Sequence, residues 1–134
     1  MAWQLSRSKT LISKAARETW ALLVEDNRPD REETGSVLRS LGFKVRTSKT
    51  RYEAELELAS RSYDLIVSDF DRGGEQAGIE ILNLSLDHSP LAKRILISGR
   101  STLKAEDASN YTFVAKPITK ARIKTALLEF QRLG

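Results

Sequence analysis

The chain has 134 residues, no cysteine and a formal net charge of +4, with 40% hydrophobic and 30% charged residues. This composition is typical of a single globular domain, and the lack of cysteine excludes disulfides, thiolate catalysis and cysteine zinc sites. No apolar run approaches the ~18 residues of a membrane span and the N-terminus carries no apolar signal region, so we expect a cytoplasmic protein.

The positive charge is concentrated at the start of the chain. Residues 1–20 contain four basic residues and one acidic residue, which leaves 18 basic and 17 acidic residues in the rest. We therefore expect no direct binding of nucleic acid, because that function needs a basic surface on the folded body. We assign residues 1–18 to a basic leader. It could be a tail, a linker helix to a neighbouring domain, or an amphipathic arm that docks to a partner or an anionic surface.

Five short apolar stretches recur over residues 19–134, each followed by a segment with helical spacing. The apolar stretches are residues 20–24, 43–45, 65–68, 94–98 and 112–115. This alternation predicts an α/β fold with a parallel sheet. We expect a doubly wound (βα)5 domain of the flavodoxin-like type, in which five parallel strands lie in the order 2-1-3-4-5.

Three of the expected helices have recognisable signals. The segment 30–42 has a polar start near Asp30 and ends at a glycine. The segment 51–60 carries an apolar stripe on one face, formed by Tyr52, Leu56 and Ala59. The last helix has Thr119 as a plausible N-cap, and its apolar face consists of Ile123, Ala126, Leu127 and Phe130.

Carboxylates follow two of the predicted strands. Glu25 and Asp26 come directly after the first strand, and Asp69 comes after the third. With the expected strand order the first and third strands are neighbours, so these three carboxylates converge at one edge of the sheet. Crowded carboxylates repel one another unless a cation or a proton compensates them. A ligand set made only of oxygens favours Mg²⁺.

Two more polar residues follow strands at the same predicted edge. Ser98 ends the fourth strand and Lys116 follows the fifth. The hydroxyl of Ser98 can donate a hydrogen bond to a phosphoryl oxygen, and Lys116 supplies a positive charge for another. This setting indicates that Asp69 is a nucleophile held by the buried strand behind it.

These motifs resemble those of the receiver domain of two-component response regulators, over about residues 19–134. The resemblance rests on "LLVEDN", "DLIVSD", "ILISG" and "FVAKP". It implies that Asp69 accepts a phosphoryl group from a histidine kinase or phosphotransfer protein and that the signal passes to an unknown downstream protein. It implies no enzyme activity beyond phosphorylation and dephosphorylation of the chain itself. The chain could also be the receiver of a hybrid kinase.

The resemblance further assigns roles to single residues. Mg²⁺ would be held by the carboxylates of Glu25, Asp26 and Asp69 and by the backbone carbonyl of Asp71. The catalytic residues would be Asp69, Ser98 and Lys116, and the switch residues would be Ser98 and Phe113. The family often has a cis bond at the position of Lys116–Pro117, which proline makes accessible.

Three features depart from the family pattern. The loop after Asp69 has Gly73 where the family usually has proline and is one residue longer. The stretch from Ser98 to Lys116 is about one helical turn shorter than usual, so we expect a short or irregular fourth helix. We also expect Asp71 and Arg100 to face each other and to gate access to the acyl phosphate.

Two other functions stay open at this stage. The order of Asp69, Asp71 and a later lysine also resembles the haloacid-dehalogenase phosphatases, in which the first aspartate is the nucleophile and the second the acid/base. That family opens with its nucleophile strand, whereas here Glu25 and Asp26 come first. The third possibility is a degenerate, unphosphorylated receiver that serves as an interaction module.

Overall fold

The computed structural model describes residues 18–69, 75–99 and 110–133. Several predictions fall on other residues and lie outside the described part. These are the leader up to residue 17, the predicted metal ligand Asp71, the predicted gate of Asp71 and Arg100, the loop with Gly73, and most of the short helix expected between residues 98 and 116.

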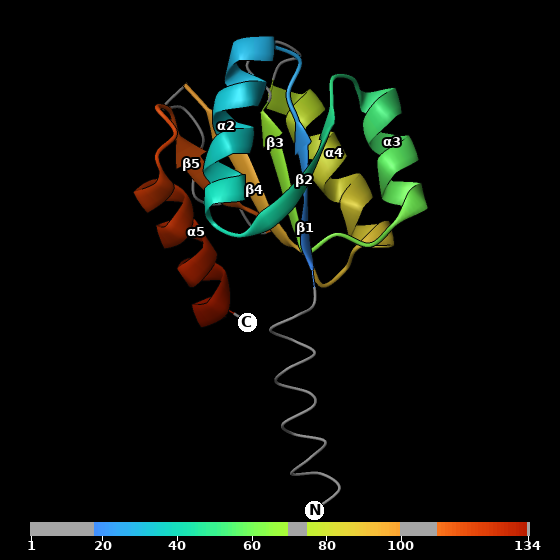
Figure 1. Ribbon diagram of the computed structural model, residues 1–134. Helices are drawn as coiled ribbons and strands as arrows, with labels where there is room; N and C mark the ends of the chain where they lie inside the picture. Colours follow the sequence, from blue (N-terminus) through green and yellow to red (C-terminus); the bar gives the residue numbers. More distant parts are fainter. Residues whose placement is uncertain (1–17, 70–74, 100–109, 134) are drawn as a thin grey trace, which may run out of the picture.

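The strands form one parallel sheet in the order β2-β1-β3-β4-β5, as predicted (Figure 1). The strands are β1 (Thr19–Val24), β2 (Phe43–Ser48), β3 (Leu65–Asp69), β4 (Lys93–Ser98) and β5 (Thr112–Ala115). At the carboxyl edge Val24 pairs with Ser48 on one side and with Ser68 on the other. Ser98 pairs with Ala115. The strands therefore end together, so the residues that follow them are brought to one edge.

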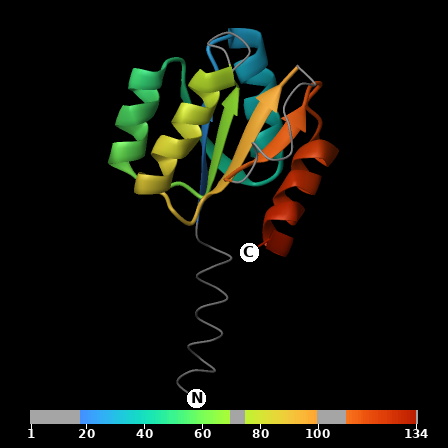
Figure 2. The same cartoon turned by 180° about the vertical axis from the view of Figure 1, so that it is seen from behind.

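Helices cover both faces of the sheet. They are α2 (Arg28–Ser40), α3 (Arg51–Ser60), α4 (Glu75–His88) and α5 (Lys120–Leu133). Figures 1 and 2 show α2 and α5 on one face and α3 and α4 on the other. None of the helices in the described ranges is long and apolar enough to cross a membrane.

Each face of the sheet has its own hydrophobic core, because successive side chains of a strand point to opposite faces. In β1, Leu22 packs against α3 and α4, whereas Leu23 packs against α2 and α5. Strands buried on both faces read as continuous apolar runs, which is why β1, β3 and β4 were recognisable in the sequence.

Helix α2 begins two residues before the predicted start at Asp30. The side chain of Asn27 accepts a hydrogen bond of 3.0 Å from the backbone N–H of Asp30 and so caps the helix. Pro29 stands in the first turn, where its missing N–H has no cost. The helix is followed by Gly42, whose φ of 100° lies in the left-handed region that favours glycine.

The predicted apolar stripe of α3 faces solvent rather than the sheet. Tyr52 is 69% exposed and Leu56 is 53% exposed, whereas Ala54 and Leu58 are buried against the sheet. Apolar residues lie on two opposite faces of this helix, so periodicity alone could not select the buried one.

Glu57 helps to orient the helix, because its carboxylate accepts hydrogen bonds from Arg46 of β2 and from the Tyr63 hydroxyl.

Candidate functional site

The ends of β3 and β5 bring an aspartate and a lysine into direct contact. Asp69 is the last residue of β3, and its side chain is only 5% exposed. The Nζ of Lys116 lies 2.8 Å from Asp69 Oδ2. The backbone N–H of Lys116 donates to the carbonyl of Ser98 at 3.0 Å, which fixes the lysine to the end of β4. The Lys116–Pro117 bond is cis, as the family resemblance implied.

Glu25 lies directly after β1 and is buried. Its backbone N–H donates to the carbonyl of Ser48 at 2.9 Å, and its Oε1 accepts from the N–H of Asn27 at 2.9 Å. Burial, and then the hydrogen bond and charge of Asp69, raise the pKa of Glu25 to about 8. This carboxyl therefore keeps its proton at pH values well above its usual titration range unless a metal cation binds beside it.

A third carboxylate joins these two from helix α2. One oxygen each from Glu25, Asp30 and Asp69 lies within 4.8 Å of the others. Asp30 was predicted only to lie near a helix start and was not predicted as a site residue. The local sequence marks only the helix start, because an asparagine N-cap followed by proline is typical of a first turn, and this turn contains Asp30.

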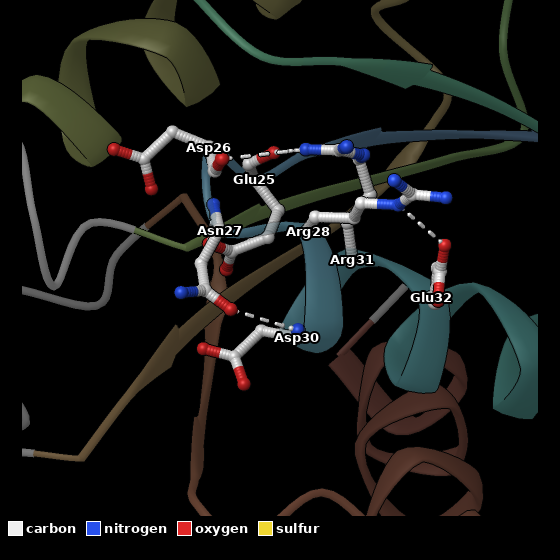
Figure 3. Close-up of polar contacts among 7 residues, drawn as sticks. All are labelled: Glu25, Asp26, Asn27, Arg28, Asp30, Arg31 and Glu32. Atoms are coloured by element: carbon white, nitrogen blue, oxygen red, sulfur yellow. Dashed lines mark hydrogen bonds and ion pairs between the residues drawn. The ribbon is translucent and has the colours of Figure 1, made fainter.

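Asp26 lies next to this carboxylate group rather than in it. Its side chain is exposed, and in Figure 3 its carboxylate points away from those of Glu25 and Asp30. Together with Glu25 and Asp69 it lines a cavity of about 200 Å³. Arg31 donates to the backbone carbonyls of Glu25 at 3.1 Å and of Asp26 at 3.3 Å. The main chain of the acidic pair is thus held by α2, while the Asp26 side chain is exposed.

The two predicted switch residues lie on β4 and β5. Ser98 is fully buried at the end of β4. Phe113 is partly buried in β5, and it lines a cavity of about 450 Å³ between β5 and α5. The structure therefore brings Glu25, Asp69, Ser98 and Lys116 to one edge of the sheet and places Phe113 on the strand that leads to Lys116.

The chemistry of this edge suits a hard divalent cation. The donor group consists of carboxylate oxygens, which are the ligands that Mg²⁺ and Ca²⁺ prefer. The raised pKa of Glu25 reflects burial and the neighbouring Asp69 carboxylate, and a bound cation would offset both effects. The adjacent ammonium of Lys116 is a group that can bind an oxygen of an anionic ligand.

Comparison with known proteins gives one consistent result. The family model described as the response regulator receiver domain matches residues 21–128. A response regulator receiver protein from Sinorhizobium medicae has a TM-score of 0.74 at 22% identity, covering 87% of this chain and 97% of that one. The signal receiver domain of an HD domain-containing protein from Pseudomonas fluorescens has a TM-score of 0.71 at 26% identity, covering 88% and 100%.

A third structure is a response regulator protein from Burkholderia pseudomallei with a phosphorylated aspartic acid, a calcium ion and citrate. Its TM-score is 0.71 at 21% identity, covering 86% of this chain and 72% of that one. No curated protein matches the chain. The family match extends over most of the sequence and agrees with the strand-end motifs and the strand order. The chain therefore belongs to the response regulator receiver domain family.

Proposed function

We propose that this chain is a phosphoryl-accepting switch of a two-component system and that Asp69 is the acceptor. The observation that carries the proposal is the nearly buried Asp69 carboxylate, 2.8 Å from Lys116 at the carboxyl edge of a receiver fold. The phosphorylated aspartic acid in the Burkholderia pseudomallei protein supports an aspartate in this role. The donor would be a phosphohistidine on a histidine kinase or a phosphotransfer protein.

In the proposed reaction a carboxylate oxygen of Asp69 attacks the phosphorus atom of the donor. A new O–P bond forms while the P–N bond to the donor imidazole breaks, and the bonding electron pair stays on the ring nitrogen, which takes a proton from water. Lys116 neutralises one phosphoryl oxygen, and the hydroxyl of Ser98 donates a hydrogen bond to another. The product is an acyl phosphate on Asp69.

The residues that would hold Mg²⁺ are Glu25, Asp26 and Asp69, with the backbone carbonyl of Asp71 as a further ligand. When bound, the ion supplies positive charge for the phosphoryl oxygens. Glu25 must lose its proton before it can act as a ligand. The Burkholderia pseudomallei structure contains a calcium ion, and this supports a divalent cation as a ligand of the present chain.

We expect the domain to act in the cytoplasm. Formation of the acyl phosphate would shift it from one conformational state to another. Ser98 would move toward the phosphoryl group, and Phe113 would repack in the cavity between β5 and α5. Phe113 has no hydroxyl, so packing rather than a hydrogen bond would drive its change of rotamer. The output would be the binding of a downstream protein.

Incubation with Mg²⁺ and acetyl phosphate, followed by intact mass spectrometry, tests the proposal. We expect the wild-type chain to gain one phosphoryl group and the Asp69→Asn variant to gain none. A folded wild-type chain that stays unmodified by acetyl phosphate, and that does not respond to beryllofluoride, would contradict the proposal. Steady turnover of a generic phosphomonoester would instead favour a phosphohydrolase.

A further inference from the structure

Helix α2 brings a carboxylate that the proposed reaction does not use into contact with Lys116. Asp30 Oδ2 lies 3.4 Å from Lys116 Nζ, while Asp69 Oδ2 lies 2.8 Å from the same atom. The ammonium group of Lys116 thus contacts two carboxylates, one from α2 and one from β3. The contact with Asp30 joins residues 86 positions apart in the sequence, so the fold creates it.

The backbone of Asp30 is held in this place by the start of α2. Asn27 Oδ1 accepts from the N–H of Asp30 at 3.0 Å (Figure 3). The carbonyl of Asn27 accepts from the N–H of Arg31 at 2.9 Å. Arg31 also binds the carbonyls of the acidic pair. The helix start is thus fixed to the end of β1, and this keeps the backbone of Asp30 within reach of Lys116.

Phosphorylation would change the balance of charge around Lys116. Asp69 already holds the lysine at the shorter distance, and its side chain is 5% exposed against 45% for Asp30. The acyl phosphate would move negative charge from the Asp69 carboxylate outward to the phosphoryl oxygens. Those oxygens would then compete with Asp30 for Lys116, and the Asp30 carboxylate would repel them at short range.

We propose that Asp30 is a positioning residue that binds Lys116 in the unphosphorylated protein and opposes the arrival of the phosphoryl group. In this role the Asp30 carboxylate occupies the partner position on Lys116 that a phosphoryl oxygen takes after transfer. Asp30 lowers both the rate of phosphorylation and the affinity for phosphoryl mimics. The inference rests on the proposed function, because it assumes transfer to Asp69.

The test compares three variants of the full chain, Asp30→Asn, Asp30→Glu and Glu33→Gln. Glu33 is the matched control, because it is on the same helix and lines the same cavity of about 430 Å³ as Asp30 and Lys116 but lies outside the carboxylate group. Two quantities are measured in Mg²⁺, the rate of phosphorylation by acetyl phosphate and the affinity for beryllofluoride. Thermal unfolding of each variant checks its stability.

We expect Asp30→Asn to raise the rate and the affinity by about two- to fivefold, the range for a partly exposed ion pair. Asp30→Glu should restore the wild-type values, since it restores the charge, and Glu33→Gln should match wild type. Asp30→Asn values equal to or below wild type would overturn the inference, as would an equal gain in Glu33→Gln, which would indicate a general charge effect. In each of these cases the wild-type chain is still phosphorylated, so the proposed function stands. Failure of the wild-type chain in both assays would instead contradict the proposed function.

Discussion

Glu25 is the site residue whose ionised form is opposed both by burial and by a neighbouring carboxylate, that of Asp69. It is buried at the end of β1, and its carboxyl shares a hydrogen bond with Asp69. A carboxylate in such surroundings is stable only when a proton or a cation neutralises it. We therefore expect Glu25 to be protonated in the metal-free site and ionised in the metal-bound site. The same argument explains why Asp69 lies beside Lys116, since a nearly buried carboxylate needs a positive partner.

Glu25 should make the stability of the metal-free protein depend on pH. Its pKa is raised from 4.5 to about 8 in the folded state, so between these values the folded chain binds a proton that the unfolded chain has lost. The free energy of unfolding should therefore fall as the pH rises from about 4.5 to about 8. Urea denaturation in EDTA at several pH values measures this slope. Glu25→Gln should flatten it, and an unchanged slope in that variant would assign the effect to another group.

At the scale of single elements, a buried arginine connects α4 to β4. Arg94 is 3% exposed, and its guanidinium donates to the hydroxyl and carbonyl of Ser85 and to the carbonyls of Ser89 and Ala92. These acceptors lie in the last turn of α4 and in the loop that follows it. The positive charge thus lies at the negative end of the helix dipole, where carbonyls lack partners within the helix.

Replacing Arg94 with leucine should destabilise the fold by about 2–4 kcal/mol, because buried carbonyl groups would lose their donors. Chemical denaturation of the two proteins gives the difference in free energy of unfolding. Arg39→Leu, at an exposed arginine of α2, is the control and should change the stability by less than about 0.5 kcal/mol. Similar effects at both positions would mean that the hydrogen bonds of Arg94 contribute little.

Helix α3 offers a direct test of which of its two apolar faces is buried. Leu58 is 2% exposed, and Leu58→Ala should cost about 2–5 kcal/mol because it leaves a cavity in the core. Leu56 is 53% exposed, and Leu56→Ala should change the stability by about 0.5 kcal/mol or less. Thermal and urea unfolding compare the two variants. The reverse ranking would show that the stripe of Tyr52 and Leu56 packs against the sheet.

For the whole molecule, the parallel order of the strands is what produces the site. Glu25, Asp69, Ser98 and Lys116 come from four separate segments, and they meet because the carboxyl ends of the strands share one edge. The hydrophobic cores on both faces keep these ends in register. The site is therefore a property of the whole sheet, and ligand binding there should stabilise the entire domain.

Magnesium should raise the stability of the folded chain through this linkage. At about a hundred times its dissociation constant the ion should add about 2.7 kcal/mol to the free energy of unfolding, because it binds the folded state alone. Urea denaturation with and without Mg²⁺ measures the gain. Asp69→Asn should lose most of it, while Glu33→Gln should keep it. An equal gain in both variants would indicate binding elsewhere on the surface.

The sequence alone located the strand segments and placed Glu25, Asp69, Ser98 and Lys116 at their ends, because these signals are local. The strand order was expected from the fold class, and the pairing of distant segments confirms it. A buried parallel strand is a continuous apolar run, and the residue after it stands at the ligand edge in any fold of this class. The N-cap at Thr119 was readable for the same reason, and its hydroxyl accepts from the N–H of Arg122 at 3.1 Å.

Only the tertiary structure decided three further features. It selected Ala54 and Leu58 as the buried face of α3. It also placed the side chain of Arg94, from β4, against the end of α4 and brought the Asp30 carboxylate to Lys116. Each depends on how one element is oriented against another, and this orientation is set by packing and long-range polar contacts rather than by local periodicity. Residues distant in sequence determine such contacts jointly, so no single segment of the chain could reveal them.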